Sequence, residues 1–245
     1  EKDHVAGAEE GAGANREFDA RNCVAGATDI MLDKMMYSVS AAQILNGLGS
    51  GSTEQKAEKL NQSLKAMDQT MDLFYQHKGL SNGEGAGAKD RLPAQHLNIR
   101  YMRMFAGAFM YAGGNHIGIE WDSVTGLSTG VPVVSDENGK YISGNLFGWG
   151  FAHEIGHNIN QNAYAVAEIT NNYFAQLVTA RDSNDSTRFK YDPNVYEKVT
   201  SGTVGRSDNQ ATQLAMYWQL HIAYDRAYNF KTYNSYQEQF NNLFY

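Results

Sequence analysis

The stretch GWGFAHEIGHN, residues 148–158, places two histidines four residues apart with a glutamate directly after the first. Residues four apart lie on one face of a helix, so His153 and His157 can hold one metal ion between their imidazoles. Glu154 then lies beside the ion, where it can take a proton from an activated water molecule. The pattern predicts a zinc site with Glu154 as general base.

The remainder of this helix, which we expect to span about residues 147–161, is amphipathic. At about 100° per residue, the two histidines lie about 40° apart around the helix axis. Apolar residues occupy the opposite side: Phe147, Phe151, Ile155 and Ile159. Gly150 and Gly156 each weaken a helix by about 1 kcal/mol relative to alanine, which indicates that another backbone packs closely against it.

A catalytic zinc ion takes three protein ligands, so a third ligand is needed. A metzincin would have a histidine six residues after His157, but that position is Ala163, which excludes the metzincin class. Glu168 is the first acidic residue after the motif. A turn near residues 162–164 and a new helix over residues 166–180 would return Glu168 to the metal, so we predict it as the third ligand.

Two further groups of polar residues bear on this site. Asn171 and Asn172 follow Glu168 by three and four residues, a position from which an amide can support a ligating histidine. The negative charge that develops on the substrate oxygen during hydrolysis would need one more hydrogen-bond donor. The candidates, to which we assign no role, are Tyr217, His221 and His116.

The whole chain has an ordinary globular composition. It has 245 residues, 42% of them hydrophobic, and a net charge of −7. An acidic chain without a basic run does not favour nucleic-acid binding or attachment to an anionic membrane, and no apolar run is long enough to insert into a bilayer. The single cysteine excludes an internal disulfide but does not decide the cellular compartment.

Apolar periodicity predicts an α+β, predominantly helical fold with a small sheet before the motif helix. We interpret residues 1–245 as one domain with a lead-in segment at 1–20, excised from a larger protein. The loop at 181–186 is acidic but lacks the glycine and distal glutamate of a calcium-binding loop, so we interpret it as solvated. The other expected elements are strands at 29–32 and within 97–121, interrupted at 113–115, and helices at 40–45, 54–77, 214–228 and 235–244. Apolar spacing predicts a core-facing stripe on the helix at 54–77, made of Ala57, Leu60, Leu64, Met67, Met71 and Phe74. On the helix from 214, one stripe carries Tyr217, Leu220, His221 and Tyr224.

The two segments that carry the predicted metal ligands together resemble the enhancin-like, mucin-degrading zinc peptidases of family M60, which are of the gluzincin type. The resemblance rests on HEIGHN at 153–158 and EITNN at 168–172, with FMYAGGNHIG at 109–118 and MYWQLHIAY at 216–224 similar to flanking segments of that family. It implies that His153, His157 and Glu168 bind Zn²⁺ and that Glu154 is the general base. It identifies no substrate-binding residue.

The resemblance also implies a biological setting. The expected enzyme is an endopeptidase that cuts O-glycosylated, mucin-type proteins beside a glycosylated serine or threonine. It would be secreted or held at a bacterial cell surface, in one chain with carbohydrate-binding modules. Two alternatives remain open at this point: a gluzincin that cuts unmodified proteins, and a non-catalytic glycan-binding module that keeps the fold. An aminopeptidase is disfavoured because the chain has no clear GAMEN-type exopeptidase segment.

Overall fold

The structure is a computed structural model, and it describes residues 26–105, 107–124, 149–181, 186, 188–201 and 209–224. The described residues form two compact units. Unit 1 contains residues 26–71 and 93–124, and unit 2 contains residues 72–92 and the described residues from 149 onward. The prediction of a single domain is not tested by this division and stays a prediction.

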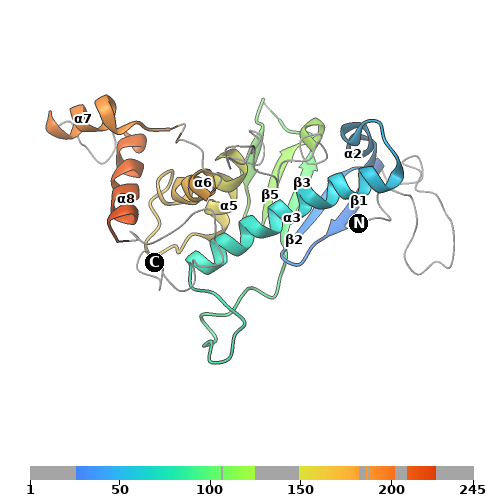
Figure 1. Cartoon of the computed structure of the whole chain (residues 1–245), viewed down its shortest axis with the longest axis horizontal. Coiled ribbons are helices and arrows are strands. Elements are labelled where there is room, and N and C mark those ends of the chain that lie inside the picture. The colour runs from blue at the N-terminus through green and yellow to red at the C-terminus, as the bar shows by residue number, and fades with distance from the viewer. Residues whose placement is uncertain are drawn as a thin grey trace. The chain divides into compact units, whose positions relative to one another are not determined.

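Unit 1 is built on a five-stranded mixed sheet with the strand order β1-β2-β3-β5-β4 (Figure 1). The β1–β2 and β4–β5 pairs are antiparallel, whereas β2–β3 and β3–β5 are parallel. The strands are β1 (Ala27–Met31), β2 (Met35–Ser40), β3 (Leu97–Met102), β4 (Met110–Ala112) and β5 (His116–Glu120). This confirms the expected sheet, including the interruption at 113–115.

Strand β2 is an element that the sequence analysis missed. Its residues Met35, Tyr37 and Val39 are fully buried, and the residues between them are only partly buried. A period of two is the pattern of a strand with one face in the core. The signal was present in the sequence but short, and it runs directly into the helix that follows at Ala41.

Both predicted helices of unit 1 are confirmed. Helix α2 (Ala41–Leu48) begins after Ser40, whose hydroxyl accepts a hydrogen bond from the Gln43 backbone N–H. Helix α3 (Thr53–His77) begins with a capping box: Ser52 Oγ accepts from the Gln55 N–H, and Gln55 Oε1 accepts from the Ser52 N–H. The buried stripe of α3 is the predicted one, and its members are Ala57, Leu60, Leu64, Met67, Met71 and Phe74.

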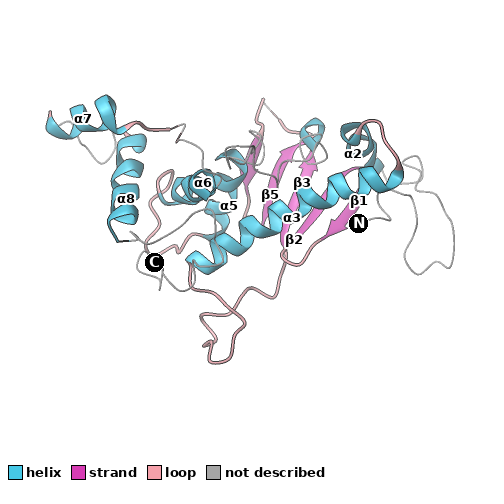
Figure 2. Ribbon diagram, in the orientation of Figure 1, coloured by secondary structure: helices cyan, strands magenta, loops and turns pink. Residues whose placement is uncertain are grey.

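Among the described residues of unit 2, the regular elements are helices joined by loops, as the ribbon in Figure 2 shows. It holds the last turns of α3, then α5 (Phe151–Ile159), α6 (Thr170–Arg181), the π-helical turn η5 (Tyr191–Val195), α7 (Tyr196–Thr200) and α8 (Gln210–Tyr224). Its core includes an aromatic cluster, in which Phe74 meets Phe174 edge to face at 5.1 Å and Tyr173 packs at 5.8 Å from Trp218.

Two helix predictions in unit 2 need correction. Helix α6 begins at Thr170, four residues later than expected, because Glu168 takes a left-handed backbone conformation with φ of 63°. Helix α8 begins at Gln210, and its Leu220 side chain is half exposed, although the sequence placed it in the buried stripe. The buried stripe of α8 is instead Leu214, Trp218 and His221.

The predicted fold class, α+β with a small sheet before the motif helix, is confirmed. The helix predicted at 235–244, the lead-in at 1–20, Phe147 and most of the acidic loop at 181–186 lie outside the described residues. Among the residues that the structure describes, no helix is long and apolar enough to cross a membrane.

Candidate metal centre

Helix α5 holds the motif histidines on one face and buries the opposite face. Phe151 and Ile155 are 1% and 0% exposed, and Ile159 is also buried, which confirms the predicted apolar anchor for the described residues. The imidazoles of His153 and His157 lie edge to face with ring centroids 4.8 Å apart. The helix ends at Ile159, and the ammonium of Lys78 donates to the carbonyl of this residue.

Gly156 brings α5 and α6 into close contact. A Cβ atom at this position would lie 2.6 Å from the carbonyl oxygen and 2.7 Å from Cα of Asn171, both of which are backbone atoms of α6. Only glycine leaves room for this approach. The prediction that Gly156 reflects close backbone packing is therefore confirmed, and the packing carries the residues after Glu168 to the histidines.

Glu168 reaches the histidines from the turn before α6. The prediction that it lies on the helix itself is wrong, because it lies two residues before the first residue of α6. The turn is closed by Thr170, whose hydroxyl accepts from the Val166 N–H and lies 3.1 Å from the Val166 carbonyl. The left-handed conformation of Glu168 is rare for a residue other than glycine, and such strain occurs often at functional sites.

The carboxylate of Glu168 bridges the two imidazoles. Its Oε1 is 3.1 Å from Nε2 of His157, and its Oε2 is 3.5 Å from Nε2 of His153. By comparison, the Oε1 atom of Glu154 is 4.0 Å from Nε2 of His153. Two imidazoles and a carboxylate are the ligand types of a catalytic zinc site, and ligand atoms bound to a tetrahedral zinc ion lie about 3.3 Å apart. The side chains present therefore fit such an ion.

Two asparagines from the start of α6 contact the histidines. Asn172 Oδ1 lies 2.6 Å from Nδ1 of His153, so it accepts the N–H and leaves Nε2 of that ring as the lone-pair nitrogen. Asn171 is fully buried, and its Nδ2 lies 3.0 Å and 3.3 Å from Nε2 of His157 and His153. The same nitrogen is 3.2 Å from Nδ1 of His153, so it contacts both nitrogens of that ring as well as Nε2 of His157. The expected amide support of a histidine is present.

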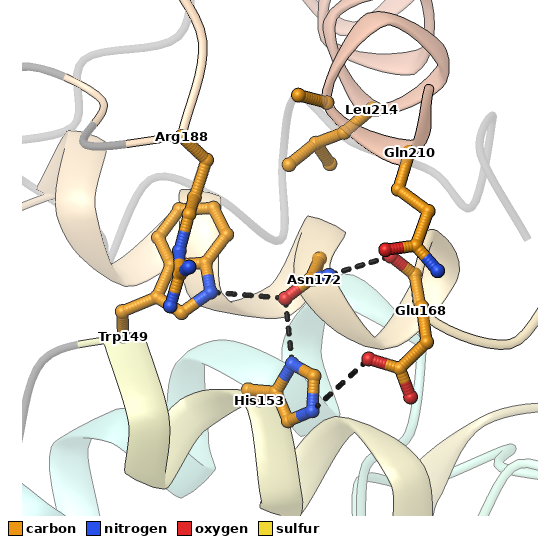
Figure 3. A pocket seen from close by; sticks show the side chains of 8 residues that line it. Trp149, His153, Glu168, Asn172, Arg188, Gln210 and Leu214 are labelled. Carbon is orange, nitrogen blue, oxygen red and sulfur yellow. Dashed lines mark hydrogen bonds and ion pairs between the residues drawn. The ribbon is translucent and has the colours of Figure 1, made fainter. Parts of the chain in front are cut away.

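A pocket of about 280 Å³ adjoins His153 and Glu168 (Figure 3). Its walls include Trp149, Asn172, Arg188 and Gln210. The guanidinium of Arg188 lies over the Trp149 ring, 5.2 Å from the ring centroid, in a cation–π arrangement. The sequence analysis missed this pocket. Trp149 could have been found, because it lies one helical turn before His153, but Arg188 follows the acidic loop and carries no sequence signal.

Among the three candidates for an oxyanion donor, His221 lies in the core of unit 2. It is 1% exposed, its Nδ1 is hydrogen-bonded to the Tyr173 hydroxyl at 2.7 Å, and its ring stacks on Trp218. Burial lowers the pKa of His221 to about 3, so the ring is neutral. His116 lies on β5 in unit 1, where its Nε2 is 3.0 Å from the Tyr111 hydroxyl. Tyr217 does not line the described pocket. We therefore assign none of the three residues as the oxyanion donor.

Comparison with known proteins places this site in a family. The model of peptidase M60, enhancin and enhancin-like, matches residues 52–243. The chain belongs to this family. The M60 assignment confirms the resemblance that the motif segments suggested, and it identifies the chain as part of a metallopeptidase family. Among the described residues, His153, Glu154 and His157 form a cluster that could hold a metal ion, with their potential ligand atoms within 4.8 Å of one another. A search of curated proteins found no match.

Solved M60 structures share the fold. The M60 catalytic domain of ZmpC from Clostridium perfringens, in complex with the sialyl T antigen, is 19% identical with a TM-score of 0.58, covering 88% of this chain and 40% of that one. A metallopeptidase in complex with Tn antigen is 17% identical with a TM-score of 0.62, covering 91% and 38%. The M60 domain of ZmpB from the same bacterium, with its CBM51-1 and CBM51-2 domains, is 22% identical with a TM-score of 0.57, covering 88% and 21%. The chain thus spans two fifths or less of these relatives.

Proposed function

We propose that this chain is the zinc-dependent catalytic part of an endopeptidase that cuts O-glycosylated, mucin-type proteins. The single observation that carries the peptidase proposal is the Glu168 carboxylate lying across the Nε2 atoms of His153 and His157. Family membership supports the reaction class, and two structural relatives solved with the Tn and sialyl T antigens support the substrate class.

The proposed roles follow from the positions of the side chains. His153, His157 and Glu168 would hold the zinc ion, which when bound supplies a Lewis acid that activates water and polarises the scissile carbonyl. Glu154 lies beside this ligand set, with its side chain 14% exposed. Its carboxylate takes the proton of the attacking water and delivers it to the nitrogen of the leaving amine.

The setting of the enzyme is also a proposal. We propose that the protein is secreted or held at a bacterial cell surface and that carbohydrate-binding modules accompany the domain in one chain. The ZmpB relative, whose chain contains CBM51 domains, supports the second point. We also propose that the pocket beside His153 and Glu168 receives a substituent of the substrate next to the scissile bond; its position against two of the predicted metal ligands supports this.

The test is mass mapping of cleavage products from two peptides of one sequence, one with a single O-glycosylated threonine and one bare. We expect cleavage of the glycopeptide beside the modified residue, much slower cleavage of the bare peptide, and none by the Glu154→Gln variant. Equal rates on both peptides would favour a gluzincin that cuts unmodified proteins. Glycan binding without any cleavage would favour a non-catalytic module and would contradict the peptidase proposal.

A further inference from the structure

Asn172 lies at the junction between the metal ligands and the pocket. Its Oδ1 accepts hydrogen bonds from Nδ1 of His153 at 2.6 Å and from Nε1 of Trp149 at 2.9 Å. Its Nδ2 donates to the backbone carbonyl of Glu168 at 2.5 Å. Figure 3 shows these three bonds radiating from one side chain.

This arrangement needs both ends of an amide group. An amide oxygen has two lone pairs, and here Trp149 and His153 use one each. The amide nitrogen is the only part of the side chain that can donate to the carbonyl of Glu168. An aspartate would keep both acceptor bonds and lose the donor, whereas an alanine would lose all three bonds. The two substitutions therefore separate the functions of the group.

The bond to Glu168 acts on a strained residue. Glu168 has a φ of 63°, a conformation that only a surrounding network keeps populated in a residue with a side chain. The Asn172 amide holds the carbonyl of this residue, while Glu168 places its carboxylate between the imidazoles. One side chain thus restrains two of the three predicted ligands, His153 through its ring and Glu168 through its backbone.

The bond to Trp149 extends the restraint to the pocket. The indole ring lines the pocket and carries the Arg188 guanidinium on its face, and its only polar atom is the N–H bonded to Asn172. When that acceptor is lost, the ring loses the bond that fixes its rotation. The pocket wall and the first metal ligand therefore share one acceptor atom.

We propose that Asn172 is a positioning residue that locks His153 and Glu168 as metal ligands and, through Trp149, ties the substrate-pocket wall to the metal centre. This inference rests on the proposed function. It predicts two separable effects of Asn172, one on metal affinity and one on substrate affinity, because its acceptor bonds lead to different partners.

The first test measures zinc affinity by competition with a chromogenic chelator and the absorption of the cobalt-substituted protein. We expect Asn172→Ala to lower zinc affinity by about 10- to 100-fold and to change the cobalt spectrum. Asn172→Asp keeps the acceptor for His153 but loses the donor to the Glu168 carbonyl, so it should recover only part of that loss. Asn162→Ala, which removes an exposed asparagine of the loop before Glu168, serves as the matched control and should match the wild type.

The second test measures kcat and KM for the cleaved peptide with zinc in saturating amounts. Trp149→Phe keeps a ring in the pocket wall but removes the N–H, so KM should rise while zinc affinity stays within about twofold of the wild type. Asn172→Ala should raise KM as well. The double variant should show no increase beyond that of Asn172→Ala, because both substitutions remove the same hydrogen bond between Trp149 and Asn172.

The outcomes separate the inference from the proposed function. A wild-type protein that binds no zinc would overturn the proposed function. A wild type that binds zinc, with the zinc affinity of Asn172→Ala within twofold of it, would overturn the metal part of the inference alone. If the rise in KM of the double variant equals the product of the two single rises, the two residues act independently, and the proposed link between Asn172 and Trp149 is overturned. If Asn172→Ala does not fold, a zinc affinity of Asn172→Asp within twofold of the wild type would overturn the metal part, and an unchanged KM in Trp149→Phe would overturn the link to Trp149.

Discussion

Replacing Gly156 with alanine tests how closely the metal site depends on the approach of α6 to α5. The new Cβ would lie 2.6 Å from the Asn171 carbonyl oxygen, against an ordinary contact of 3.4 Å or more, so the backbone of α6 must retreat by about 0.8 Å. Overpacking of this kind costs about 1–3 kcal/mol, and the better helix propensity of alanine returns about 1 kcal/mol. The net loss of folding stability should be at most about 2 kcal/mol.

The effect on metal binding should be larger than the effect on folding. A zinc site tolerates ligand displacements of about 0.2 Å, and the retreat of α6 would move the segment that holds Glu168 and Asn172 several times farther. We therefore expect zinc affinity to fall by at least 10-fold in Gly156→Ala, in line with the effect of disturbing residues that support a zinc ligand. The measurements are chelator competition for zinc affinity and thermal unfolding of the metal-free protein for stability.

The matched control is Gly114→Ala, where an added Cβ meets no atom within 4 Å. This variant should keep the zinc affinity of the wild type. Zinc affinity of Gly156→Ala within about twofold of the wild type would refute the reasoning, because it would mean that the approach of α6 does not position the ligands.

Three further predictions concern other parts of unit 2. Glu154→Gln should abolish hydrolysis in a peptide-cleavage assay while circular dichroism stays unchanged; full activity would contradict the role of Glu154 as general base. Lys78→Met should lower the free energy of unfolding by about 1–3 kcal/mol in urea, because the carbonyl of Ile159 loses a charged donor; an unchanged midpoint would contradict this. Burial lowers the pKa of His77 well below its usual range and that of His221 to about 3, so the unfolded chain binds protons that the folded chain does not. The free energy of unfolding should therefore fall as the pH drops below about 6.5, by about 1.4 kcal/mol per pH unit for each histidine, and His221→Gln should remove one share of that slope.

The sequence predicted the histidine pair because helical geometry alone brings residues four apart together. It also predicted that Glu168 would join them, since Glu168 is the first acidic residue after the motif and the intervening turn is short enough. It did not predict how Glu168 arrives. A left-handed backbone at a glutamate depends on the network around Asn172 and Thr170, which no local propensity reveals.

The pocket shows a second limit of sequence reasoning. Trp149 shares the helical spacing of the motif, but Arg188 and Gln210 come from separate segments that only the tertiary structure brings to His153. Their positions depend on the packing of α6 and α8, for which the sequence gives an apolar stripe but no geometry. The error at Leu220 has the same origin, because periodicity alone does not say which side of α8 meets α6.

The central claim, a zinc ion held by His153, His157 and Glu168, is tested most directly by native mass spectrometry of the purified protein. We expect a mass shift of one zinc ion per chain in the wild type, retention of that shift in Glu154→Gln, and its loss in Glu168→Ala at the same zinc concentration. A wild type without bound zinc, or a Glu168→Ala variant that keeps zinc while Glu154→Gln loses it, would contradict the proposed ligand set.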